Sequence, residues 1–189
     1  VAEGLNLSDD FIALTTASHH AEPIHQKMIS KWLKKFKLKE NHLSCGPSWP
    51  WNIKDQFEAH TKYKVKRKIF HNCSGKHCGH LAVSQYKNLP IKNYQNKNHP
   101  IQKDLIKLTE DLSKYKIKNI GVDGCTLPNP LIPLKKFAFA AAQLAAYKKL
   151  GEYSAIAKRI FDSCIKFPEI AGGSTSTNSI LTTLSKGRV

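Results

Sequence analysis

Apolar residues in this chain recur mostly at helical spacing, and only two short stretches have the character of strands. From Glu22 to Phe36 they return every three or four positions with lysines between them, which predicts an amphipathic surface helix. Caps, first-turn prolines and similar periodicity predict further helices over 9–16, 53–63, 74–86, 100–112, 134–149 and 152–166, and a short one after the GGSTSTNS link. The candidate strands are 65–70 and 118–124, and two short strands do not make a stable sheet. We therefore expect a predominantly helical α+β chain, with residues 1–189 forming one domain.

The composition is that of a globular protein with an ordinary core. Hydrophobic residues make up 41% of 189 positions, and the longest apolar run, 137–147, is far shorter than the roughly 20 residues that cross a bilayer. The first residues, VAEGLNLSDDFIAL, lack the pattern of a signal peptide. Five cysteines, an odd number without an export signal, favour reduced thiols or metal ligands over disulfides. We expect no membrane association and a cytoplasmic location.

The net charge of +16 raises the possibility of nucleic-acid binding. However, 27 of the 30 basic residues are lysines, whereas base recognition favours the planar fork of arginine. The lysines accompany many asparagines and isoleucines, as an AT-biased genome would produce. Specific nucleic-acid binding is therefore disfavoured, although a basic zinc-containing module that binds nucleic acid or an acidic protein remains the alternative function.

The stretch HNCSGKHCGH, residues 71–80, concentrates possible metal ligands around a Ser-Gly turn. A zinc finger needs two closely spaced ligand pairs. Here four residues separate Cys73 from Cys78, an unusual spacing, and no second cysteine pair follows. A closed zinc finger is therefore disfavoured. We interpret His71, Cys78 and His80 as residues outside any functional site.

Five motifs occur in the order ASHHAEPIH, LSCGPSWP, HNCSGKHCG, NHPIQ and GVDGCTLP, followed by AFAAAQLAA and PEIAGG. Together they resemble the bacterial-type L-asparaginase II family, related to the inducible rhizobial enzyme, over nearly all of the chain. The resemblance implies a fold like that of serine β-lactamases and serine-dependent glutaminases. It also implies an amidohydrolase that converts L-asparagine to L-aspartate and ammonia through serine–lysine pairs.

The resemblance also implies roles for individual residues. Ser18 matches the second active-site serine of the family, and Cys73, Lys76 and Cys125 match a zinc site. Asp123, His77 and His19 are then expected to contact the substrate or to orient the site. The spacing of Cys73 and Lys76 fits this assignment, because the first turn of a helix can direct both side chains at one centre.

The chain departs from the family at both ends. The family's Ser-x-x-Lys nucleophile precedes the ASH motif, but the 17 residues before Ser18 lack it. Three matches elsewhere, beginning at Ser84, Ser113 and Ser163, are of a kind that a lysine-rich chain produces by chance. The closing Lys-x-Gly-Ala-Glu-Gly motif is also missing, and Lys186 is its candidate substitute.

From these departures we expect a partial fold that lacks much of its sheet, with an exposed apolar face. We also expect weak or absent activity, which a complementary fragment or a homo-oligomer could restore. Smaller departures are His20, and Thr126 in place of the family's glycine.

Overall fold

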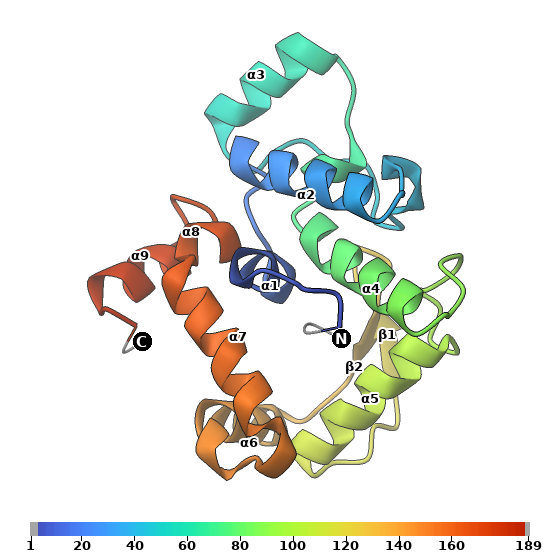
Figure 1. Ribbon diagram of the computed structural model, residues 1–189, viewed down its shortest axis with the longest axis vertical. Helices are drawn as coiled ribbons and strands as arrows, with labels where there is room; N and C mark the ends of the chain where they lie inside the picture. Colours follow the sequence, from blue (N-terminus) through green and yellow to red (C-terminus); the bar gives the residue numbers. More distant parts are fainter. Residues whose placement is uncertain (1–3, 188–189) are drawn as a thin grey trace.

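The computed structural model describes residues 4–187, and it is built almost entirely of helices (Figure 1). The longer helices are α1 (Asp9–Thr16), α2 (Pro23–Lys35), α3 (Ile53–Tyr63), α4 (Ser74–Tyr86), α5 (Pro100–Ser113), α6 (Leu134–Ala145), α7 (Ser154–Lys166) and α9 (Thr177–Leu184). Short helical turns are η1 (Glu40–His42), η2 (Lys68–Phe70), η3 (Tyr147–Lys149), η4 (Gly151–Tyr153) and α8 (Pro168–Ala171). The two strands, β1 (Ile120–Val122) and β2 (Pro128–Pro130), form one antiparallel hairpin. The expected fold class is confirmed.

The expected strand over 65–70 is wrong. Arg67 forms only an isolated bridge with Ser48, and a helical turn, η2, follows it. The carboxylate of Glu40 accepts hydrogen bonds from the backbone N–H groups of Lys68 and Ile69. A side chain thus satisfies the backbone groups that a neighbouring strand would otherwise pair.

The partner of β1 was missed because its sequence is Pro-Asn-Pro. Backbone hydrogen bonds join Leu131 to Asn119 and Asp123 to Leu127 on either side of the strands. In this register Pro128 and Pro130 occupy positions whose N–H groups an antiparallel ladder does not use. Prolines are therefore tolerated in this hairpin, although they normally indicate a loop.

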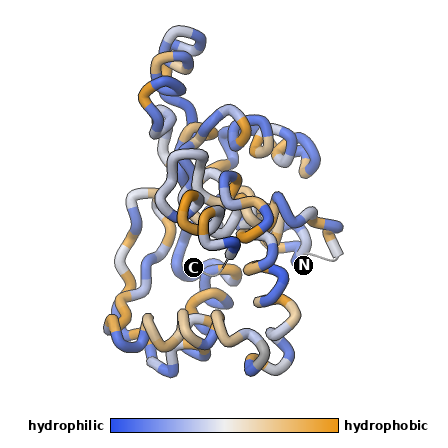
Figure 2. The backbone as a smooth tube through the Cα atoms, turned by 90° about the vertical axis from the view of Figure 1, so that its left-hand side faces the viewer, coloured by the Kyte–Doolittle hydropathy of each residue, from blue (hydrophilic) through white to orange (hydrophobic). Residues whose placement is uncertain are grey.

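The buried core lies where α1, α2 and α4 meet. Its largest apolar contributions come from Phe11, Leu14, Ile29, Trp32 and Leu81. By contrast, α6 buries none of its side chains, and apolar residues of α6, α7 and α9 are exposed, among them Leu134, Phe137, Ile156 and Leu184. In Figure 2 the hydrophobic residues of α6 lie at the bottom of the molecule. No helix among residues 4–187 is long and apolar enough to cross a membrane.

Two glycines of α4 allow it to cross α1 at close range. A Cβ atom at Gly75 would overlap the carbonyl oxygen of Leu14, and one at Gly79 would lie 3.1 Å from Cγ2 of Thr15. Both glycines are one turn apart on the same face of α4, so the backbones of the two helices approach without intervening side chains. This crossing places the end of α1 beside the first turn of α4.

Two stacked histidines are buried beneath this crossing. The rings of His19 and His25 lie 4.6 Å apart and nearly parallel, and both side chains are fully buried. Nδ1 of His19 accepts the N–H of Ala21, and Nε2 of His25 contacts the carbonyl oxygen of Glu169. Burial lowers the pKa of both histidines, and in His19 the neighbouring His25 lowers it further. Both rings are therefore neutral near pH 7.

We predict that Gly75→Ala destabilises the chain by about 1–3 kcal/mol, because the added methyl group must push the backbones of α1 and α4 apart. Gly46→Ala is the matched control, since no atom lies within 4 Å of the Cβ that it adds. Urea denaturation monitored by circular dichroism measures both variants. Equal stability of the two variants would contradict the close crossing.

We also predict that stability falls as the pH drops below about 6.5, the ordinary pKa of histidine. The unfolded chain then binds protons that the folded chain excludes, so each buried histidine contributes a slope of up to about 1.4 kcal/mol per pH unit. Above that pH the contribution is complete. Denaturation at several pH values gives the slope of the free energy of unfolding against pH. In His25→Gln this slope should fall by the equivalent of about one bound proton. In His60→Gln, whose side chain is exposed, it should be unchanged. An unchanged slope in both variants would refute the neutral buried pair.

Candidate functional site

Ser18 and Lys76 form the centre of the candidate site. Ser18 follows the end of α1, and Lys76 lies in the first turn of α4. The close crossing of these helices brings the two side chains together, and Nζ of Lys76 donates a hydrogen bond of 2.9 Å to Oγ of Ser18. Ser18 is exposed, so its hydroxyl is accessible to a small molecule. An amine at this distance can accept the serine proton when the amine is neutral.

Cys73 lies beside this pair at the N-cap position of α4. Its Sγ atom is 3.9 Å from Oγ of Ser18, and its side chain is buried. The backbone N–H of Cys73 donates to Nδ1 of His71 at 3.0 Å. Cys73 and Lys76 therefore approach Ser18 from the same helical turn, as their spacing predicts.

Cys125 and Asp123 enter the site from the turn that joins β1 to β2. The thiol of Cys125 donates to Oδ2 of Asp123 at 3.1 Å, while the N–H of Gly124 donates to Oδ1 at 2.7 Å. Thr126 closes the turn with φ +77°, a backbone conformation that strains a β-branched residue. Its hydroxyl donates to the carbonyl oxygen of Ser44 at 3.3 Å, which ties the turn to the loop before α3.

The two cysteines differ in acidity. The neighbouring Cys125 lowers the pKa of Cys73, against the opposing effect of burial, and His71 and Lys76 lower it further. Cys73 in turn raises the pKa of Cys125, and burial raises it as well. Cys73 is therefore the thiolate of the pair, and the pKa of Asp123 is lowered mainly by the hydrogen bond from Cys125.

Cys73, Asp123 and Cys125 could together hold a metal ion. One ligand atom from each residue lies within 4.8 Å of the other two, and both sulfurs are buried. Two thiolates and a carboxylate are suitable ligands for a tetrahedral divalent metal such as zinc. The donors present thus fit a metal, and the structure adds Asp123 to the three ligands expected from the sequence.

His19 and His77 do not line this site. The ring of His19 is occupied by Ala21 on one nitrogen and by Ser74 and Gly75 on the other. His77 is also fully buried, and its Nδ1 contacts the hydroxyl of Tyr94. Both histidines lie behind the first turn of α4, where they position its backbone.

The hydrogen-bond pattern around His77 defines its proton. The N–H of Ser44 donates to the hydroxyl of Tyr94 at 2.8 Å, so that hydroxyl donates its own proton to Nδ1 of His77. The neutral ring then carries its proton on Nε2, which has no hydrogen-bond partner among the described residues. Burial lowers the pKa of His77 to about 3.

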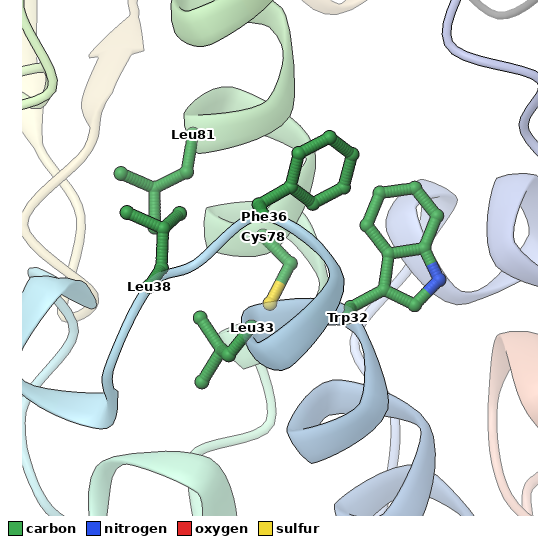
Figure 3. A pocket seen from close by; sticks show the side chains of 6 residues that line it. All are labelled: Trp32, Leu33, Phe36, Leu38, Cys78 and Leu81. Carbon is green, nitrogen blue, oxygen red and sulfur yellow. The ribbon is translucent and has the colours of Figure 1, made fainter.

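His71, which the sequence places outside any functional site, contacts a site residue, because Nδ1 of its ring accepts the backbone N–H of Cys73. Its position two residues before Cys73, just ahead of a helix, was the one available indication. Cys78, by contrast, packs among apolar side chains of the core, including Trp32, Leu33 and Leu81 (Figure 3). His80 packs against Tyr94, with ring centroids 6.0 Å apart.

The other candidate serines and Lys186 lie elsewhere. Ser84, Ser113 and Ser163 are all buried, so none of their hydroxyls opens to solvent. Lys186 belongs to the turn after α9, where the neighbouring Gly187 packs against Ile165. The lysine that contacts the Ser18 hydroxyl in residues 4–187 is therefore Lys76 and not Lys186.

A family model described as L-asparaginase II matches residues 1–189, so it covers every segment that contributes to the site. No curated protein matches the chain.

Proposed function

The chain belongs to the L-asparaginase II family, and on this premise we propose that its site binds L-asparagine and acts on the side-chain amide, yielding L-aspartate and ammonia. The observation that carries the proposal is the 2.9 Å hydrogen bond between Lys76 and Ser18. This bond joins a hydroxyl accessible to solvent to an amine, and the thiolate of Cys73 lies immediately beside it.

In the proposed reaction Ser18 and Lys76 transfer protons. Lys76 in its neutral form accepts the proton of the Ser18 hydroxyl, and the hydroxyl oxygen in turn accepts a proton from a water molecule whose oxygen bonds to the amide carbon. Reversing these transfers delivers a proton to the amide nitrogen as the C–N bond breaks, and ammonia leaves. Ser18 and Lys76 are therefore the catalytic residues of the proposal.

We further propose that zinc is the metal of this site. Cys73 and Cys125 would hold it together with Asp123, which leaves the amine of Lys76 available to Ser18. Lys76 is the alternative third ligand expected from the family resemblance, and as a ligand it would no longer accept the serine proton. When bound, zinc would act as a Lewis acid toward a substrate oxygen. The thiolate character of Cys73 supports this choice, because a cysteine binds metal in its deprotonated form.

Residues 1–189 by themselves are expected to be weakly active or inactive. Among residues 4–187 the accessible serine–lysine pair is Ser18 with Lys76, whereas the resemblance implies two such pairs. α6, α7 and α9 pack on α5, α1 and α8, but their exposed apolar residues leave one side of each helix uncovered. We propose that a complementary polypeptide or a second copy of the chain covers these helices and completes the site.

The cysteines favour a reducing compartment, which we propose to be the cytoplasm. All five are free thiols in the structure, and four of them are buried. Burial raises the pKa of Cys45 to about 12 and also raises that of Cys78, so these two are inert core residues.

We predict that L-asparagine raises the midpoint of thermal unfolding of the chain, because a ligand at about 100 times its Kd adds about 2.7 kcal/mol to stability. Ser18→Ala should abolish at least nine-tenths of this protection and of any ammonia release. Ser30→Ala, which removes an exposed hydroxyl of α2, should retain both. Absence of protection in the unmodified chain would contradict asparagine binding.

We predict about one zinc per chain by elemental analysis of the purified protein. Cys73→Ala and Cys125→Ala should each lose it, because each removes one thiolate ligand. Cys164→Ala should keep it, since Cys164 contacts Thr16 at the far side of α1. Zinc that persists in both of the first two variants would refute the assignment.

A further inference from the structure

The basic residues of the chain are concentrated in two segments. Residues 27–39 contain six lysines and residues 62–68 contain four lysines and Arg67, and neither segment contains an acidic residue. Eleven of the 30 basic residues thus lie in about a tenth of the chain.

The fold brings the end of the first segment and Arg67 of the second to one groove. The groove has a volume of about 420 Å³ and runs between the end of α2 and the residues around Arg67. Lys34, Lys37 and Lys39 line it from one side, and Arg67 lines it from the other. In Figure 2 hydrophilic residues prevail in the upper part of the molecule, where Figure 1 places α2 and α3. The groove shares no residue with the Ser18–Lys76 site.

The positive charge of the groove is not neutralised within the protein. Glu40 is the acidic residue of the lining, and its carboxylate already pairs with Arg67 and with two backbone N–H groups. Among the residues that the structure describes, Lys34, Lys37 and Lys39 form no ion pair, and all three are exposed. Three exposed ammonium groups without an ion-pair partner among the described residues therefore lie across the groove from Arg67.

Arg67 is held in place by aromatic and ionic contacts. Its guanidinium lies over the rings of Tyr63 and Phe70, at 4.8 and 5.5 Å from their centroids. Its Nε atom also donates to Glu40 at 3.2 Å. The two adjacent rings and the ion pair with Glu40 thus hold this side chain in place, and the unpaired positive charge of the groove is that of its lysines.

We propose that this groove binds the phosphate backbone of single-stranded nucleic acid without preference for base sequence. The charge continues beyond the groove: Lys27, Lys31 and Lys34 lie on one face of α2 and extend over about 10 Å at 1.5 Å per residue. A repeating anion uses all of these charges, whereas a mononucleotide would leave most of them unpaired. Lysines bind phosphates as point charges and do not read base edges as arginine does.

The shape of the site separates this ligand from other polyanions. A positively charged groove that tracks the phosphate backbone is one feature of proteins that bind a single strand, and without aromatic residues among the described residues of its lining this groove would contact the backbone rather than the bases. A flat membrane surface, by contrast, contacts protruding residues. The apolar residues of the groove, Leu33, Leu38 and Ile69, are buried and cannot insert into lipid. The low arginine content, which disfavours specific recognition, is compatible with binding through the backbone alone.

The test measures binding of a fluorescein-labelled oligouridylate of about 15 nucleotides by fluorescence anisotropy, at about 50 and 200 mM salt. Lys34→Gln/Lys37→Gln/Lys39→Gln should weaken binding at least tenfold. It should also reduce the slope of log K against log salt by about 2, since each single-strand phosphate contact contributes about 0.7. Lys97→Gln/Lys103→Gln/Lys118→Gln is the matched control, because it removes the same charge from exposed lysines elsewhere. The control should stay within about twofold of the unmodified chain.

Equal losses in the two triple variants would overturn the proposal, because binding would then follow net charge alone. Binding to phosphatidylserine vesicles without binding to the oligonucleotide would also overturn it. As a second readout that needs no variant, photo-crosslinking of 4-thiouridine oligonucleotides should label peptides from 27–39 and 62–68. Crosslinks confined to other segments would contradict the groove.

Discussion

The site depends on the close approach of two helix backbones. Gly75 of α4 leaves no side chain between that helix and the carbonyl oxygen of Leu14 in α1. Because both helices contribute a site residue at the end nearest to this contact, Ser18 and Lys76 meet within hydrogen-bond distance. The contact of Gly75 with Leu14 thus sets the geometry of Lys76, one residue after Gly75, and of Ser18, four residues after Leu14.

Buried polar contacts then fix the first turn of α4. His19 reaches from the segment after α1 to Ser74, and Tyr94 reaches from beyond α4 to His77. Both histidines can therefore be required for the structure of the site without touching a substrate. Burial keeps both rings neutral, so they act as rigid hydrogen-bonding groups in the core rather than as charges near the site.

Local sequence predicted the helices well because their caps and periodicity are local properties. It failed at 65–70, where a side chain from Glu40 replaces a strand partner, and at β2, where register makes two prolines harmless. The pairing of Cys73 with Lys76 follows from spacing along one helical turn. Ser18 and Cys125 could be connected to them only through the family resemblance, since no local pattern reports a contact across 50 residues. The contacts of Ser18 with Lys76 and of His71 with Cys73 emerged only from the three-dimensional arrangement.

The candidate metal ligands come from two elements: Asp123 and Cys125 lie in the turn of the β1–β2 hairpin, and Cys73 caps α4. A two-stranded hairpin is marginally stable by itself, and this one includes the strained backbone of Thr126. Any ligand that engages Cys73 and Cys125 at once therefore requires the hairpin to be docked against the helices. Occupancy of the cluster and docking of the hairpin are in this sense a single linked equilibrium, in which each favours the other by the same free energy.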